Sequence, residues 1–436
     1  MTKRSLVASI NGIPVGELDA ADDIWQFIYD PAWLASPERY ALSPELPLQP
    51  EPIRDGSTKR HVQWYFDNLL PEEGQRTLLA ADAKVSAGDS FALLEYYGAE
   101  SAGSVTLLRP GQANHLTPAL RQLSLEALEA RIQNLPHVPL THSAIKRMSL
   151  AGAQHKLAVV FRDGALFEPG GPTPSTHILK PNHQDTDDYP HSVINEYFVL
   201  RLADALRLPV PGVRRLYVPS PVYLIDRFDR IEVTGEWKRV HTLDACQLLS
   251  MSSAFKYSRG SVDTLCDLVD RTRFPASTRI NLFRWLVFNL LIGNSDAHLK
   301  NLSFLVTTEG ISLAPFYDLL SIAAYDTGTY GKSGWPAGTR LAWGLLGTDA
   351  FHAVDKALLI SCAEKLGISA RTAERFLHQM CKDILPAADN LLTEIRTGNA
   401  KLRTANPALA PVLAGEEKML RVIRFTIIAD MVKQLS

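Results

Sequence analysis

One stretch of the sequence reads Gly293-Asn294-Ser295-Asp296-Ala297-His298-Leu299-Lys300-Asn301, which places an aspartate and an asparagine five residues apart. An apolar run, residues 282–292, precedes it and predicts a buried helix that leads into the loop. After it, residues 302–306 and 311–314 alternate like two strands joined by a turn, which would return Asp318 to the side of Asp296. The pattern therefore predicts one polar site built from a helix, a loop and a hairpin.

An aspartate, an asparagine and a second aspartate in this order suit phosphoryl transfer from a nucleotide. That reaction needs little covalent work from the protein and depends on positioning and charge neutralisation. Asp296 would orient the acceptor hydroxyl and accept its proton, while Asn301 and Asp318 would offer oxygen ligands to Mg²⁺. The alternative is an ordinary polar loop capped by Asn294 and Asp296, and the presence of Asp318 makes that alternative less favourable.

Two basic side chains lie in the same loop. His298 or Lys300 could meet the transferring γ-phosphate if another lysine binds the α- and β-phosphates. Alternatively, His298 simply bonds to the loop backbone. A histidine that contacts phosphate should give turnover a pH dependence in the range where imidazole titrates, which separates the two interpretations.

A second feature lies earlier in the chain, in the loop between two expected strands of residues 148–160. Small residues there would let backbone N–H groups approach phosphate oxygens. The residues expected to contact the nucleotide are Ala151, Gly152, Ala153, Gln154, His155 and Lys156. Because the loop holds a single glycine, a plain β-hairpin is an alternative.

A lysine, a glutamate and an apolar strand follow in the order found in kinases. Lys180 ends a short strand and Glu196 lies on the next expected helix. In kinases, a lysine and a glutamate placed in this way form the pair that positions the α- and β-phosphates. The strand at 222–225 leads into Asp226-Arg227-Phe228, a candidate hinge whose backbone would face adenine. Isolated charges of this kind are also typical of solvated surfaces and of strand ends with local ion pairs.

The bulk properties exclude several other classes of protein. A length of 436 residues predicts two to three domains. A net charge of −2 and a pI near 6.6 indicate no overall attraction to nucleic acid or membrane. The four cysteines lie far apart without a Cys-x-x-Cys pair, so neither a zinc cluster nor a disulfide framework is expected. With no evident signal peptide and no apolar run long enough to span a bilayer, we expect a soluble cytoplasmic protein without membrane contact.

The chain is predicted to have three parts. Residues 1–108 begin with a strong hairpin signal at Asn11-Gly12, residues 109–245 hold the nucleotide-binding elements, and residues 246–436 are mostly helical. Helical periodicity in the last part covers 278–292, 350–366, 370–385 and 416–434. The predicted fold class is α+β, a two-lobed protein-kinase-like fold with an extra N-terminal α/β unit and a mostly helical C-terminal lobe.

Taken together, these pieces resemble the HipA family of serine/threonine kinases, the toxin halves of bacterial toxin–antitoxin pairs, over nearly the whole length. The resemblance rests on Phe66-Asp67-Asn68-Leu69-Leu70-Pro71, Ser149-Leu150-Ala151-Gly152-Ala153-Gln154, the strand ending at Lys180, Asn195-Glu196-Tyr197, Arg227-Phe228-Asp229-Arg230, residues 296–301 and Pro315-Phe316-Tyr317-Asp318. It implies the use of ATP and Mg²⁺ and autophosphorylation of Ser149, which we expect to inactivate the enzyme.

The resemblance also implies partners. The substrate would be a protein of translation, with an aminoacyl-tRNA synthetase such as glutamyl-tRNA synthetase as the best known target in the family, and its phosphorylation would cause growth arrest and persistence. A small helix-turn-helix antitoxin, similar to HipB, would sit on operator DNA and autoregulate the operon together with the toxin. Between Trp343 and Phe351 the chain is short and lacks the basic insertion that some members use near DNA, so direct DNA contact by this chain stays open.

Two other interpretations are to be weighed. A small-molecule kinase of the aminoglycoside or choline type shares the Asp-x₄-Asn motif and a later aspartate, but the N-terminal unit and Ser149 argue against it. A catalytically silent scaffold that only helps an antitoxin to repress would usually lack a metal ligand, whereas Asp296, Asn301 and Asp318 are all present. Incorporation of phosphate into proteins rather than metabolites would separate these interpretations.

Overall fold

The computed structural model describes residues 3–112, 117–148, 150–152 and 154–436, which form two compact units. The first unit comprises Met1–Pro181, Leu224–Phe255 and Ser303–Ser312. The second comprises Asn182–Tyr223, Lys256–Leu302 and Leu313–Ser436. The chain passes between the units several times, so these units are a different division of the chain from the three ranges predicted from the sequence.

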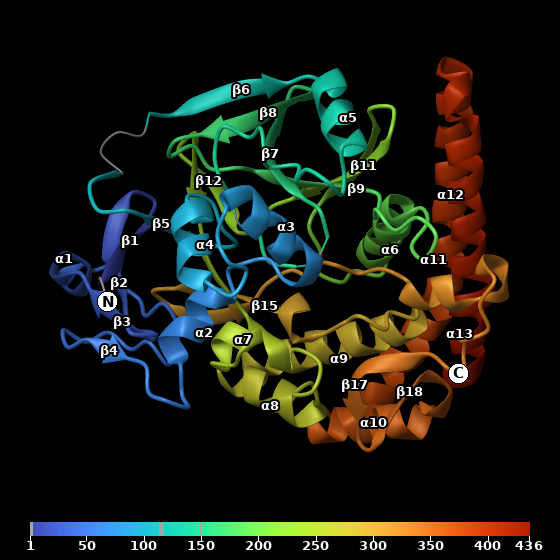
Figure 1. The fold of residues 1–436 in the computed structure, drawn as a ribbon. Coiled ribbons are helices and arrows are strands. Elements are labelled where there is room, and N and C mark those ends of the chain that lie inside the picture. Colours follow the sequence, from blue (N-terminus) through green and yellow to red (C-terminus); the bar gives the residue numbers. More distant parts are fainter. Residues whose placement is uncertain (1–2, 113–116, 149, 153) are drawn as a thin grey trace. The chain divides into compact units, whose positions relative to one another are not determined.

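The N-terminal part of the first unit is an antiparallel sheet with the strand order β4-β3-β2-β1-β5 (Figure 1). Its strands are β1 (Arg4–Ile10), β2 (Ile13–Ala21), β3 (Ile24–Tyr29), β4 (Ile53–Arg54) and β5 (Val105–Leu108). The hairpin predicted at Asn11-Gly12 is confirmed, because β1 and β2 pair on either side of it. Both turn residues have positive φ angles, 50° and 82°, as the tight turns of two-residue hairpins require.

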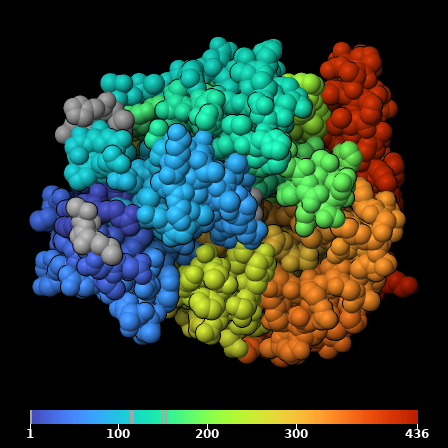
Figure 2. All heavy atoms as spheres, viewed as in Figure 1, coloured from blue at the N-terminus to red at the C-terminus, as the bar shows by residue number. Residues whose placement is uncertain are grey.

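Four helices follow within this part: α1 (Pro31–Ala35), α2 (His61–Asp67), α3 (Glu73–Ala83) and α4 (Ser90–Tyr97). Two of them, α2 and α4, contribute aromatic rings to the core. The ring centre of Phe66 lies 5.7 Å from that of Phe27, and the ring of Phe91 meets that of Trp25 edge-on with centres 5.3 Å apart. All four rings are almost fully buried, and each such burial stabilises the fold by about 1.5–3 kcal/mol. Both α3 and α4 reach the surface of this unit in the space-filling view (Figure 2).

A second sheet in the first unit carries the predicted nucleotide-binding residues. In this unit it consists of β6 (Ala119–Leu123), β8 (Ala165–Gly170), β7 (Leu157–Arg162), β9 (His177–Pro181) and the last three residues of β11 (Pro221–Asp226), in this order. The remaining elements are α5 (Leu125–Gln133), the hairpin β12 (Arg230–Val233) and β13 (Glu236–Arg239), α7 (Ala245–Leu248), and a sheet of β14 (His241–Asp244), β15 (Ser303–Thr307) and β16 (Gly310–Leu313). The hairpin predicted between residues 302 and 314 is confirmed as β15 and β16.

The second unit is mostly helical, as predicted for the C-terminal part. Its helices are α6 (Ser192–Ala205), α8 (Val262–Asp270), α9 (Pro275–Leu291), α10 (Lys356–Lys365), α11 (Ala370–Ala405), α12 (Ala410–Val422) and α13 (Ala429–Leu435), with a π-helical segment at Ile423–Ile428. Its strands are β10 (Val213–Tyr217), β17 (Arg340–Leu345) and β18 (Thr348–Ala350). The buried helix predicted before the loop of residues 293–301 is confirmed as α9, in which residues 282–291 are buried except for Arg284 because this half is mostly apolar.

One helix is much longer than the sequence predicts. The periodic stretch is expected to end at residue 385, because Pro386 lacks an N–H and normally breaks or kinks a helix. Instead α11 runs for 36 residues with Pro386 inside it. The apolar stripe continues beyond the proline at Ala388, Leu391 and Ile395, all buried, and their packing outweighs the local cost. Neither α11 nor any other helix of the described residues is long and apolar enough to cross a membrane.

Candidate active site

The loop after α9 is braced by its own side-chain amides. Asn294 donates to Oδ1 of Asn289 at 2.7 Å and accepts from the N–H of Asp296 at 3.1 Å. Asn301 donates from Nδ2 to the carbonyl of Asp296 at 2.9 Å. Gly293 begins the loop with φ at 65°, and a β-carbon there would lie 2.7 Å from two neighbouring side chains, so only glycine fits. Asn294 is not a helix cap, since α9 ends with Ile292 as its cap and the next helix begins after His298, but its two bonds orient the loop that carries Asp296.

Asp318 lies on a segment that is hydrogen-bonded to this loop. Tyr317 donates its hydroxyl to the carbonyl of Lys300 at 2.7 Å, so the residues next to Asp318 and Asn301 contact each other. Asp318 has φ at 51°, a left-handed conformation that is uncommon outside glycine and clusters at functional sites. The structure therefore brings the two predicted magnesium ligands onto adjacent segments of the second unit.

The backbone around Asp318 is fixed on both sides. After it, Asn195 of α6 accepts from the N–H of Ser321 at 2.8 Å and donates to the carbonyl of the same residue at 2.9 Å. Before it, the buried ring of Phe316 stacks against Trp285 of α9. Surrounding structure that over-determines a backbone in this way can hold a strained φ. Sequence analysis missed the role of Asn195, because its partner lies 126 positions further along the chain.

The donor set of Asn301 and Asp318 fits Mg²⁺. Because Nδ2 of Asn301 is committed to the loop backbone, Oδ1 is the atom that this side chain can offer to a cation. Mg²⁺ prefers oxygen ligands and is commonly bound by one or two carboxylates together with substrate phosphates. Within the described residues, no group of three or more His, Cys, Asp or Glu side chains could hold a metal ion.

A tyrosine that sequence analysis missed contacts the predicted base. Tyr257 donates its hydroxyl to Oδ1 of Asp296 at 2.5 Å, and the ring of His298 lies edge-on to the tyrosine ring at 5.0 Å. Tyr257 precedes Asp296 by 39 residues, and no local pattern links the two. Lys300 is buried and His298 is half-buried, and a contact of either with the γ-phosphate remains a prediction.

The predicted phosphate loop lies in the first unit against the start of α3. Gly152 forms a β-bridge with Pro71 and has φ at 107°, which favours glycine. The side-chain amide of Gln75 lies 2.7 Å from Nδ1 of His155. The motif that ends at Pro71 therefore supports the predicted phosphate loop, because Pro71 and the start of α3 contact that loop directly.

Further hydrogen bonds close this loop. Lys156 donates from Nζ to the carbonyl of Ala151 at 2.5 Å, and Gln154 donates to the carbonyl of Pro181 at 3.4 Å. In this structure Lys156 thus braces the loop backbone, and its direct contact with phosphate remains a prediction. Ser149, the predicted autophosphorylation site, and Ala153, a predicted nucleotide contact, lie outside the described residues.

The predicted lysine and glutamate pair belongs to different units. Lys180 lies on β9 of the first unit and Glu196 lies on α6 of the second. Both side chains are almost fully buried, which is rare for these residue types unless their charges are paired. The alternative that they are solvated surface charges is therefore wrong, while their contact with nucleotide phosphates remains a prediction.

The predicted hinge is tied down by hydrogen bonds and ion pairs. Asp226 pairs with Nε2 of His177 at 3.0 Å, and the N–H of Arg227 donates to the carbonyl of Thr176 at 2.9 Å. The buried guanidinium of Arg227 donates to both carboxylate oxygens of Asp229, at 2.9 and 2.6 Å. The side chain of Arg227 therefore serves the fold, and the predicted contact of its backbone with adenine remains a prediction. The nucleotide contacts expected of Asp226 and Phe228 remain predictions.

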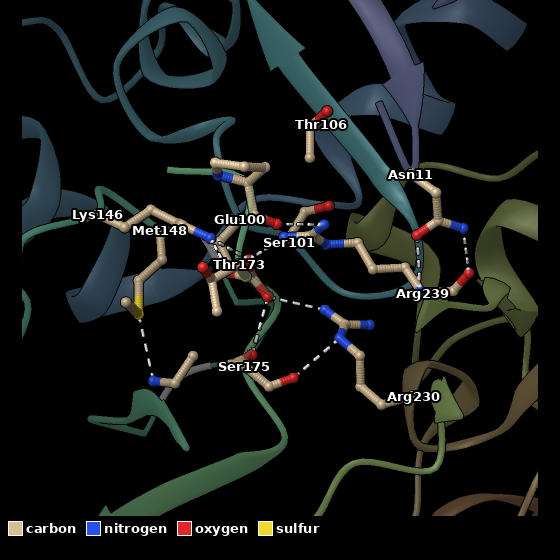
Figure 3. A network of polar contacts seen from close by, with 12 residues as sticks. Asn11, Glu100, Ser101, Thr106, Lys146, Met148, Thr173, Ser175, Arg230 and Arg239 are labelled. Atoms are coloured by element: carbon tan, nitrogen blue, oxygen red, sulfur yellow. Dashed lines mark hydrogen bonds and ion pairs between the residues drawn. The ribbon is translucent and has the colours of Figure 1, made fainter. Parts of the chain in front are cut away.

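Arg227 belongs to a buried network of charges centred on Glu100, which Figure 3 shows with Lys146, Arg230 and Arg239. At its centre, the fully buried Glu100 accepts from Arg230 at 2.8 Å, from Arg239 at 2.7 Å and from Lys146 at 3.2 Å. Burial by itself would raise the pKa of Glu100, but Arg239, Lys146, Arg230 and Arg227 together hold that pKa well below its ordinary value. The ion pairs weighed as an alternative for the hinge therefore exist, but they lie in the core rather than on the surface.

Family comparison agrees with this arrangement of elements. Residues 6–108 match the model of the HipA N-terminal domain, and residues 148–388 match the model of the HipA-like C-terminal domain. The chain belongs to the HipA family. A putative kinase of Sinorhizobium fredii, Y4mE, is 37% identical to it over 74% of this chain and 79% of the relative. The serine/threonine-protein kinase toxin HipA of Shewanella oneidensis is 32% identical over 74% of this chain and 76% of the relative.

A solved structure supports the same assignment over the whole chain. HipA of Shewanella oneidensis, in a complex with HipB and its operator DNA, matches with a TM-score of 0.76 and 26% identity. The match covers 98% of this chain and 99% of that one. The predicted α+β, kinase-like fold is therefore confirmed, and this HipA-family chain is a kinase.

Proposed function

We propose that this HipA-family chain is the toxin of a type II toxin–antitoxin pair, and that it transfers phosphate from ATP to a serine or threonine of a protein. The observation that carries the proposal is that the loop with Asp296 and Asn301 is hydrogen-bonded to the segment that carries Asp318, through Tyr317 and Lys300, because this puts the expected base and the two expected oxygen ligands on braced segments. The relative from Shewanella oneidensis, named a serine/threonine-protein kinase toxin, supports the choice of acceptor.

In the proposed reaction each residue has one task. Asp296 orients the acceptor hydroxyl and accepts its proton, and Oδ1 of Asn301 and the carboxylate of Asp318 hold Mg²⁺. The metal, when bound, neutralises charge on the β- and γ-phosphates. Lys180, whose expected partner is Glu196, binds the α- and β-phosphates. The loop of residues 151–156 offers backbone N–H groups to the phosphates, and the backbone of residues 226–228 faces adenine.

The acceptor that we propose is an aminoacyl-tRNA synthetase, with glutamyl-tRNA synthetase as the first candidate. Its phosphorylation in the cytoplasm would stall translation and cause growth arrest. A HipB-like helix-turn-helix antitoxin would bind the toxin and, with it, repress the operon through operator DNA. The relative from Shewanella oneidensis was solved in a complex of this composition, which supports the partner class.

Autophosphorylation of Ser149 is the proposed off-switch. A phosphate adds about −1.5 to −2 charges next to the site that ATP phosphates would occupy, so the two repel each other. The neighbouring Lys146 is committed to Glu100 in the buried network and is a poor receptor for that phosphate. Arg147, whose guanidinium lies 3.7 Å from the centre of the Tyr96 ring, is the better candidate.

The test is phosphate transfer by purified protein with labelled ATP and Mg²⁺, with glutamyl-tRNA synthetase as acceptor. Asp296→Asn and Asp318→Ala should each lower transfer by about 100-fold or more, whereas Asp163→Asn, in an exposed turn, should retain full activity. Label that enters metabolites but no protein would favour a small-molecule kinase. An inactive wild type that still represses the operon with its antitoxin would favour a silent scaffold.

A further inference from the structure

The predicted base of the reaction carries a hydrogen bond that its proposed chemistry does not explain. Oδ1 of Asp296 accepts from the hydroxyl of Tyr257 at 2.5 Å, within the second unit. A hydrogen bond to a charged acceptor is among the stronger ones in a protein, and it is shorter than a neutral one. Tyr257 is 41% exposed, so the contact lies where an acceptor protein can approach from solvent.

Tyr257 is itself fixed to the catalytic loop. The carbonyl of the preceding residue, Lys256, accepts from the N–H of Leu299 at 3.1 Å, and the carbonyl of Tyr257 accepts from the N–H of Gly260 at 3.0 Å. Its ring packs edge-on against His298, two residues after the base. The tyrosine therefore moves together with the loop, and its hydroxyl is presented to Asp296 in a defined direction.

We propose that Tyr257 is a positioning residue for phosphoryl transfer, and this rests on the proposed role of Asp296 as base. The torsion about the Cβ–Cγ bond of an aspartate is broad, so an isolated carboxylate samples many orientations. The bond from Tyr257 fixes Oδ1 and thereby directs Oδ2 toward the place where the acceptor hydroxyl must lie. Fixing that direction in advance lowers the entropic cost of reaching the reactive geometry.

The opposite role is that the tyrosine hydroxyl imitates the acceptor and blocks the base. Two observations favour positioning over blocking. First, a carboxylate has two oxygens that accept hydrogen bonds, and Tyr257 occupies Oδ1. Second, the backbone bonds of Lys256 and Tyr257 tie the tyrosine to its own segment and to the loop, whereas a blocking group has to leave before each turnover.

Replacement of Tyr257 by phenylalanine tests the proposal, because it removes the hydroxyl and keeps the ring. We expect kcat for protein phosphorylation to fall by about 10- to 100-fold, the range for loss of one hydrogen bond to a charged group. The KM for ATP should stay within about twofold, since the nucleotide contacts are unchanged. The matched control is Tyr330→Phe: the Tyr330 hydroxyl is buried in the same unit, lacks a hydrogen-bond partner among the described residues, and should be dispensable.

A second variant separates positioning from a general loss of structure. In an Asp296→Asn background, adding Tyr257→Phe should change the remaining kcat by less than about threefold, because the tyrosine acts through the base. An equal loss in both backgrounds, an unchanged kcat in Tyr257→Phe, or a raised kcat would each overturn the proposal. If the wild type transfers no phosphate, the proposed function fails and this inference falls with it. If the wild type is active and Tyr257→Phe matches it, only this inference fails.

Discussion

Replacing Glu100 with glutamine should strongly destabilise the first unit, because it removes the carboxylate at the centre of the buried network (Figure 3). One carboxylate oxygen accepts from Ser175 and Arg230, both at 2.8 Å, and the other accepts from Arg239 at 2.7 Å and from Lys146 at 3.2 Å. Glutamine keeps the shape of the side chain but turns an NH₂ donor toward one of these sets of donors. After the substitution, Asp229, which pairs with Arg227 and Arg230, is the carboxylate of the network that remains to balance the buried cations.

The expected size of the effect follows from this geometry. Removing one partner of a buried ion pair costs about 3–5 kcal/mol, because the remaining charges stay buried without compensation. For a unit of this size, each kcal/mol lowers the melting temperature by about 2–4 °C, so we expect a fall of about 6–20 °C. Lys146→Met should behave differently. Burial lowers the pKa of Lys146 to about 8 although Glu100 acts in the opposite direction, so the attraction of Glu100 does not offset the cost of burying this charge.

The assay compares thermal unfolding of the wild type, Glu100→Gln and Lys146→Met at pH 7, followed by calorimetry and near-ultraviolet circular dichroism. We expect Lys146→Met to change the unfolding free energy by no more than about 1 kcal/mol. Glu236→Gln, in the exposed hairpin of the same unit, is the matched control for loss of a carboxylate and should be neutral. The reasoning is refuted if Glu100→Gln melts within about 2 °C of the wild type, or if Lys146→Met falls as far as Glu100→Gln.

Three further outcomes are expected from the same structure. Asn195→Ala should cost about 2–3 kcal/mol and lower kcat tenfold or more, measured by denaturant unfolding and steady-state kinetics, because it frees the segment after Asp318. Burial lowers the pKa of His241 to about 4, so the wild type should lose roughly 3 kcal/mol of stability as pH falls from 6.5 to 4. His241→Gln should lack this loss, whereas the control His137→Gln should retain it. Gln75→Ala should raise the KM for ATP severalfold and leave the melting temperature within about 2 °C, since it removes a support of the phosphate loop; an unchanged KM would contradict that role.

The helix, loop and hairpin that carry Asp296, Asn301 and Asp318 could be predicted because their signal is local. Asp296 and Asn301 belong to one loop, and Asp318 follows a hairpin whose strands alternate visibly in the sequence. Short-range periodicity and turn residues are sufficient to place such elements next to each other. The structure adds what periodicity cannot show, namely that the amide of Asn301 is turned by its bond to the carbonyl of Asp296.

The supporting residues could not be predicted, because their partners are distant in the sequence. Glu100 and Arg239 are 139 positions apart, and Asn195 and Ser321 are 126 positions apart. A charged or amide side chain taken alone is most often solvated, so the sequence gives it no special weight. Arg227 shows the same limit: its partner Asp229 is local, but its other partners, Glu100 and the carbonyl of Ser101, lie 127 and 126 positions earlier in the chain.

The first 108 residues therefore contribute to the support of the predicted nucleotide site. The phosphate loop is supported on both sides by this part of the chain: Lys146, before the loop, pairs with Glu100, and Gly152, inside it, bridges to Pro71. These contacts all lie within the first unit, which includes Met1–Pro181 without interruption. An isolated kinase part would expose Lys146 and the loop to solvent and leave three buried arginines without Glu100. In this chain, the N-terminal residues cannot be removed without loss of stability, because Glu100 from this part neutralises the buried cations that support the predicted hinge and the phosphate loop.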